Sequence, residues 1–166
     1  DGDIFSGPNW TLEALMTPGH TSDHMCLALR EENALFSGDH IMGWSTTVVS
    51  PPDGDMDAYL ASLDRVQARG FATLWPTHGP PVTEVRTFVQ AYKDHRLDRE
   101  AQIIAQLEAG QTQIMDMVPV MYAAIDKRLY PAAAHSVLAH LIRLVKQGRV
   151  LADGAQGIQT NYRLSA

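Results

Sequence analysis

Three short segments of this sequence carry side chains that bind metal ions. Residues 17–24 (TPGHTSDH), 37–40 (SGDH) and 76–80 (PTHGP) each place a histidine or an aspartate beside a glycine, at the end of an apolar run. Imidazole and carboxylate groups suit zinc or a similar first-row ion. Glycine lets the backbone bend where a larger residue would clash. The pattern therefore predicts a metal site built on loops.

The segments before these loops have the pattern of strands. Residues 10–17, 25–30 and 34–37 are apolar or alternate between apolar and polar, and residues 71–75 form a fourth run of this kind. The runs over residues 10–17, 34–37 and 71–75 each end where one of the three ligand segments begins. Residues 43–53, with Trp44, hydroxyl side chains and two prolines, predict a stiffened loop that either lines a substrate cleft or covers the core.

Helical spacing of apolar residues dominates the rest of the chain. We expect helices over residues 55–69, 82–109, 112–122 and 131–147. A terminal hairpin is expected over residues 150–164. Asp55 or Asp57 is expected to cap the first helix and Gly70 to end it, and Thr112 is expected to cap the third. The polar side chains of the last helix, His140 among them, are expected to form a solvated face. Helices followed by a hairpin predict a winged helix.

Composition narrows the class of protein. The chain has 166 residues, of which 45% are hydrophobic, and contains a single cysteine, Cys26. This allows one packed domain with a small appendage and excludes an internal disulfide, which fits a cytoplasmic location. No apolar run approaches the roughly 20 residues of a membrane span. Residues 1–92 contain four basic and twelve acidic side chains, and residues 93–166 contain nine basic and seven acidic ones. The first part is therefore acidic and the second mildly basic.

Together the three ligand segments, the loop that begins at Gly43 and the helical tail resemble the metallo-β-lactamase superfamily, and within it the β-lactamase-like protein 2 type. The resemblance implies an α+β protein. Residues 1–92 would form the carboxy-terminal half of the αββα sandwich, and residues 93–166 a winged-helix domain. The His-x-His-x-Asp-His cluster of the first half of that fold is absent from this sequence.

The resemblance also implies roles for individual residues. His20 would ligate the first of two zinc ions, Asp39 would bridge both, and His78 would ligate the second. Since zinc normally has at least three protein ligands, we expect the chain alone to hold metal loosely and to be nearly inactive.

Apart from the resemblance, the residues leave two roles open for Thr21 and Asp23, which either orient His20 through hydrogen bonds or shape a turn or helix start. His24 is expected to pack under the loop, and His40 to lie either behind the metal ligands or in solvent.

The chemistry implied by the family is hydrolysis by a hydroxide held between two metal ions, with Asp39 as the catalytic bridging ligand. The metal motif does not choose between esters, thioesters, lactones and phosphodiesters, and single-stranded RNA is one of the substrates implied by the resemblance. A second function class stays open, in which the winged helix binds nucleic acid or another partner and residues 1–92 are a scaffold. We also expect exposed apolar surface on residues 1–92 and, as a result, a homodimer.

Overall fold

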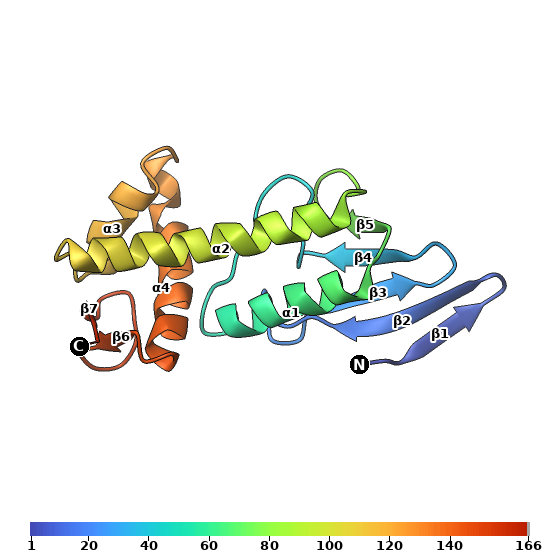
Figure 1. Ribbon diagram of the computed structural model, residues 1–166, viewed down its shortest axis with the longest axis horizontal. Coiled ribbons are helices and arrows are strands. Elements are labelled where there is room, and N and C mark those ends of the chain that lie inside the picture. Colours follow the sequence, from blue (N-terminus) through green and yellow to red (C-terminus); the bar gives the residue numbers. More distant parts are fainter. Residues whose placement is uncertain (166) are drawn as a thin grey trace. The chain divides into compact units, whose positions relative to one another are not determined.

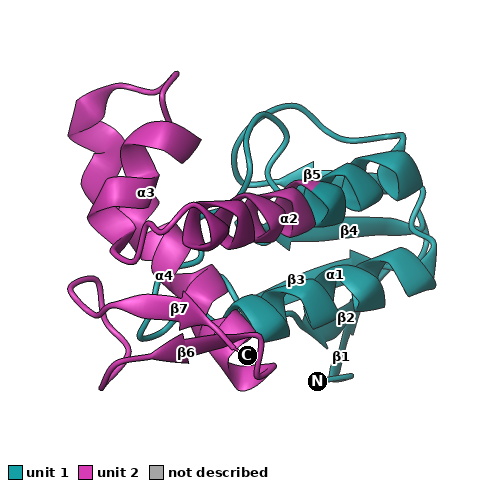
Figure 2. Ribbon diagram, turned by 60° about the vertical axis from the view of Figure 1, so that its left-hand side comes forward, with its two compact units in different colours: residues 1–94 teal, residues 95–166 magenta. Residues whose placement is uncertain are grey.

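The computed structural model describes residues 1–165. The chain divides into two compact units, residues 1–94 and residues 95–166 (Figure 2). Helix α2 (Val85–Glu108) runs through the boundary between them. No helix in the described part of the chain combines the length and the apolar character needed to cross a membrane.

The first unit is built on one five-stranded sheet with the strands in sequence order (Figure 1). The strands are β1 (Ile4–Gly7), β2 (Trp10–Met16), β3 (Met25–Leu29), β4 (Ala34–Gly38) and β5 (Thr73–Pro76). Neighbours are antiparallel from β1 to β4, whereas β4 and β5 are parallel. The sequence did not predict β1, which joins β2 through a tight turn with Asn9 at a φ of 67°. Asparagine tolerates this left-handed conformation better than most residues.

Helix α1 (Met56–Arg69) makes the crossover that parallel pairing of β4 and β5 requires. The side chain of Asp55 accepts a hydrogen bond from the Ala58 N–H, and Gly70 ends the helix at a φ of 66°. Asp55 was one of the two predicted caps and Gly70 the predicted end, so these predictions are confirmed. A carboxylate satisfies a free N–H of the first turn, and glycine enters the left-handed region without a Cβ clash.

The two faces of the sheet differ in what covers them. Helix α1 and the first turns of α2 lie over one face (Figure 2), on which Cys26, Leu35 and Leu74 are buried. The opposite face carries side chains of the alternate register, and five of its large apolar side chains are exposed by 41% to 54%: Phe5, Trp10, Met25, Phe36 and Trp75. We call these five residues the outer sheet face.

The second unit has the predicted helices and terminal hairpin. It holds the end of α2, α3 (Ile114–Met121), a 3-10 turn (Lys127–Leu129), α4 (Tyr130–Lys146) and the antiparallel pair β6 (Val150–Ala152) and β7 (Tyr162–Leu164). Its core is formed by buried apolar residues of the three helices together with Val150 and Tyr162 of the hairpin. The predicted cap of α3 was wrong, since Gln113 occupies that position and makes no side-chain bond to the helix. Thr112 instead pairs with Asn161.

A buried polar cluster joins α2 to α4 within this unit. Glu100 is 3% exposed, and its carboxylate accepts two hydrogen bonds of 2.7 Å from Nη1 of Arg143. His140 is fully buried, with Nδ1 lying 3.3 Å from Oε1 of Glu100. The expected solvated face of this helix was therefore wrong at His140. The helical pattern shows that polar residues share a side, but not that another helix brings a carboxylate to meet them.

Candidate metal centre

Strand direction places the three predicted ligands at one edge of the sheet. Because β2 and β4 are each antiparallel to β3, and β5 is parallel to β4, the strands β2, β4 and β5 all point the same way. His20 follows β2, Asp39 follows β4 directly, and His78 follows β5. The loops after these strands therefore meet beyond a common edge.

The two imidazoles flank the carboxylate. Nε2 of His20 lies 4.0 Å from Oδ2 of Asp39, and Nε2 of His78 lies 3.5 Å from Oδ1 of the same side chain. All three side chains are accessible, with exposed fractions of 27% for His20, 37% for Asp39 and 53% for His78. The arrangement is one carboxylate between two ring nitrogens at an open edge.

A backbone contact sets the tautomer of His20. Nδ1 of the ring lies 2.6 Å from the carbonyl oxygen of Val48. A carbonyl only accepts hydrogen bonds, so Nδ1 carries the proton and, in the neutral ring, Nε2 keeps its lone pair. The nitrogen that faces Asp39 is therefore the one free to bind a metal, which is the usual way that a second contact orients a histidine ligand.

The donor set fits a divalent cation. Oδ1 of Asp39 is buried and accepts no hydrogen bond from any described residue. Such an orphaned carboxylate oxygen is rare and needs a partner, which a cation would supply. Among residues 1–165, no three histidine, cysteine, aspartate or glutamate side chains are grouped closely enough to hold one ion. The described residues thus offer two imidazoles with one carboxylate between them.

Two further histidines lie beneath the site. The ring of His24 is 6.1 Å from that of His20 and 5.9 Å from that of His40, between ring centroids. His24 Nδ1 is paired with the Thr17 hydroxyl at 2.8 Å. A Cβ on Gly38 would lie only 2.8 Å from His24 Nε2, so glycine is required next to Asp39. His24 packs under the loop, in agreement with the structural role expected for it.

Burial keeps these two rings neutral. Desolvation lowers the pKa of His24, and the nearby His20 adds to the effect. Desolvation is also the main cause that lowers the pKa of His40 to about 3, although a backbone group of Ser62 opposes it. His40 is fully buried, so its placement in solvent, one of two alternatives expected from the sequence, was wrong. Its ring packs edge-on against Tyr59 at 4.9 Å.

Thr21 and Asp23, which the sequence left between orienting His20 and shaping a turn, are paired with each other. The Thr21 hydroxyl donates a hydrogen bond of 2.9 Å to the Asp23 carboxylate, two residues along the chain. The hydrogen bond that orients His20 goes instead to the backbone of Val48. Sequence reasoning missed this contact because a carbonyl oxygen is present at every residue and carries no signal in residue type.

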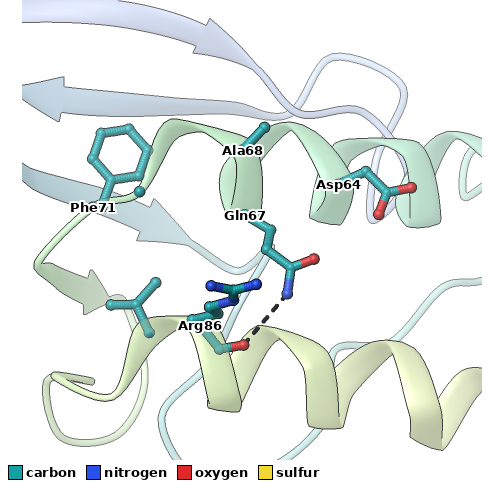
Figure 3. A pocket seen from close by; sticks show the side chains of 7 residues that line it. Asp64, Gln67, Ala68, Phe71 and Arg86 are labelled. Atoms are coloured by element: carbon teal, nitrogen blue, oxygen red, sulfur yellow. Dashed lines mark hydrogen bonds between the residues drawn. The ribbon is translucent and has the colours of Figure 1, made fainter.

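Two hollows in the first unit differ in their relation to these ligands. One, of about 320 Å³, lies on the outer sheet face and reaches Gly38 and Thr77, the neighbours of Asp39 and His78. The other, of about 500 Å³, includes no predicted ligand in its lining, as Figure 3 shows. There Gln67 donates to the Arg86 carbonyl oxygen at 3.4 Å, and Asp64 is engaged by Lys93. Asp64 and Gln67 of this lining therefore already have partners.

Comparison with known proteins shows which family the chain is similar to. Residues 1–78 match the metallo-β-lactamase superfamily, and residues 114–158 match the β-lactamase-associated winged helix domain. A β-lactamase-like protein 2 homolog from Caenorhabditis elegans is 39% identical over 141 residues, which cover 84% of this chain and 46% of that protein. An atrochrysone carboxyl ACP thioesterase from Aspergillus chevalieri is 31% identical over 165 residues, covering 95% of this chain and 52% of that one.

A solved structure shows the same fold. A β-lactamase domain protein from Burkholderia ambifaria superimposes with a TM-score of 0.88 at 24% identity, over 99% of this chain and 51% of that one. The chain spans about half the length of the curated relatives it matches. The expected α+β fold class is confirmed, with a metallo-β-lactamase fold followed by a winged helix. The chain belongs to the metallo-β-lactamase superfamily.

Proposed function

We propose that this chain is the part of a metal-dependent hydrolase that supplies His20, Asp39 and His78 to a pair of zinc ions. The observation that carries the proposal is the Asp39 carboxylate, which lies between two imidazole nitrogens and keeps a buried oxygen without a hydrogen bond. Zinc is proposed because imidazole and carboxylate ligands together favour it over harder ions such as magnesium.

Each of the three residues has a distinct task. His20 presents Nε2 because the Val48 carbonyl holds the proton on Nδ1. Asp39 has two oxygens that face different imidazoles, as a bridging ligand requires. His78 is the most exposed of the three and lies where a substrate arrives from solvent. When bound, the ions supply Lewis-acid activation of water and of the substrate's electrophilic centre.

For the substrate we propose a thioester or a related ester. The similarity to a protein named as an acyl carrier protein thioesterase supports an acyl centre rather than a phosphorus centre. The hollow that reaches the neighbours of Asp39 and His78 contains no charged side chain among the described residues of its lining, so it does not call for a charged substrate backbone.

The ligand count leads to a further part of the proposal. Catalytic zinc normally has three protein ligands, whereas the described residues offer each ion one imidazole and a shared carboxylate. We therefore propose that the 166-residue chain alone binds zinc weakly and hydrolyses substrate slowly.

Zinc titration by calorimetry tests the ligand assignment on the 166-residue chain. Asp39→Asn keeps the shape of the side chain and removes its charge, so we expect zinc binding to fall by at least about tenfold, and His78→Ala to weaken it in the same sense. His135→Ala, on α4, is the matched control and should leave binding unchanged. Unaltered binding in both site variants would rule out the assignment. A tight, stoichiometric pair of zinc ions on the unaltered chain would contradict the proposed weakness of the site.

A further inference from the structure

Residues 42–48 form a loop that is tied to all three proposed ligands. The Gly43 N–H donates to the His78 carbonyl oxygen at 2.8 Å. The Thr47 hydroxyl donates to the Asp39 carbonyl oxygen, and the Val48 carbonyl accepts from His20 Nδ1. We call residues 42–48 the Trp44 loop. Its position is fixed by the same residues that form the site.

Tyr92 and Gly79 also hold the backbone of the Trp44 loop in place. The Tyr92 hydroxyl contacts the carbonyl oxygens of Met42 and Ser45, one on each side of Trp44. Gly43 and Gly79 pack backbone against backbone, and a Cβ on Gly79 would lie 2.8 Å from the Cα of Gly43. These contacts anchor the residues on both sides of Trp44, so its ring has a defined place beside the site.

Trp44 itself is not used by the core. Its side chain is 73% exposed, more than any other large apolar side chain described as exposed. Its ring is nearly parallel to that of His78, with an angle of 9° between planes and 6.4 Å between centroids. An indole that is anchored, exposed and parallel to a ligand ring offers a flat apolar surface directly beside the reacting centre.

We propose that Trp44 determines specificity by stacking against an aromatic ring of the substrate next to the bond that is hydrolysed. This inference rests on the proposed function, because it takes the reacting centre to be at His20, Asp39 and His78. Flat rings gain from offset stacking on an indole in a way that puckered aliphatic rings of equal size do not. Trp44 therefore selects aryl over alkyl acyl groups.

The test compares two carboxylic acids, which resemble the acyl product, on the 166-residue chain in the presence of zinc. Binding of 2-naphthoate and of decahydro-2-naphthoate, which has the same bicyclic skeleton without aromatic rings, is measured by ligand-observed NMR titration. We expect Trp44→Ala to weaken 2-naphthoate about fivefold and decahydro-2-naphthoate less than twofold, and Trp44→Phe to keep most of the preference. Trp10→Ala, on β2, is the control for loss of an exposed tryptophan elsewhere and should change neither affinity.

The outcomes separate this inference from the proposed function. Equal weakening of both acids in Trp44→Ala, no weakening, or no binding of either acid to the unaltered chain would overturn the role of Trp44. Zinc affinity measured on the same variants reports on the ligands instead. Normal zinc affinity in Trp44→Ala with a lost aryl preference supports both proposals. In Asp39→Asn, zinc affinity could stay unaltered while the aryl preference persists. That result would support the role of Trp44 and contradict the assignment of Asp39 as a metal ligand.

Discussion

At the scale of single residues, the types and spacing of side chains indicated the proposed ligands, but not the contacts that orient them. His20, Asp39 and His78 could be selected because glycine-flanked histidine and aspartate residues end apolar runs. The carbonyl of Val48 and the stacking of Trp44 on His78 could not be selected, since both depend on where a loop of more than ten residues returns to the sheet edge. His140 was misplaced for the same reason, because its partner Glu100 is 40 residues away.

Gly79 provides a test of how tightly the Trp44 loop is anchored. Its φ is +95°, and a side chain there would also strike the backbone of Gly43. Gly79→Ala should therefore lower the free energy of unfolding by about 2 kcal/mol, because backbone strain and a steric clash act together. Urea denaturation followed by tryptophan fluorescence measures the change.

Gly70→Ala is the matched control for that experiment. Gly70 also has a positive φ, of +66°, but nothing lies within 4 Å of the position of its Cβ. Only the conformational cost remains, about 1 kcal/mol. Equal losses in the two variants would mean that the contact between Gly79 and Gly43 does not constrain the loop.

At the scale of elements, the alternation of apolar and polar residues predicted four of the five strands of the first unit to within a few residues. It did not say which face of the sheet would be covered. Both faces are apolar, since Cys26, Leu35 and Leu74 lie under the helices while Phe36 and Trp75 are exposed on the other side. A strand with apolar side chains on both faces is typical of a sheet buried between two layers.

The outer sheet face leads to a prediction about association. An exposed apolar sheet face can pack against a second sheet, and a second copy of the chain offers the same surface in a self-complementary pair. We expect the 166-residue chain to dimerise reversibly and Phe36→Glu to shift it toward monomer in sedimentation velocity experiments. Leu129→Glu replaces a similarly exposed apolar residue of the second unit and should leave association unchanged. A chain that stays monomeric at all concentrations, or an equal effect of both substitutions, would show that this face does not drive assembly.

At the scale of the whole molecule, the winged helix and its mildly basic charge left open a second unit that binds nucleic acid, and several of its arginines have partners within the unit. Arg143 binds Glu100, Arg128 binds Asp126 and Arg163 lies 3.5 Å from Asp153. Arg99 donates to the Met121 carbonyl and lies over the Tyr122 ring. Arginines with partners inside the unit contribute less to a phosphate-binding surface than their number in the sequence suggests. RNA binding by the winged helix stays a prediction.

Acidification should destabilise the molecule through groups in both units. Desolvation lowers the pKa of the buried histidines His40 and His140 in the folded chain. As pH falls through about 6.5, these two rings therefore become protonated in the unfolded chain but stay neutral in the folded chain. Stability is therefore lost as pH falls below that value, down to about 3 for His40. Hydrogen bonding to Arg69 is the main cause that lowers the pKa of Glu13 to about 2, so its contribution is complete above about pH 4.5 and is lost toward pH 2.

The pair of Glu100 and Arg143 makes this pH dependence testable in the second unit. Burial raises the pKa of Glu100, but hydrogen bonds from His140 and Arg143 outweigh it and leave the pKa below its usual value, so the carboxylate stays charged in the fold. Glu100→Gln leaves a partly buried guanidinium without its carboxylate, and we expect a loss of about 3 kcal/mol at pH 7 in urea unfolding followed by far-ultraviolet circular dichroism. The contribution of this carboxylate is complete above the usual pKa of a glutamate and is lost as pH falls below it through the lowered pKa of Glu100, so the difference between parent and variant should shrink with acid. Asp126→Asn removes the carboxylate of an exposed pair with Arg128 and serves as the control, with no measurable change expected. A Glu100→Gln loss that is small, or that stays constant from pH 7 to pH 3, would mean that the buried pair does not stabilise the contact between α2 and α4.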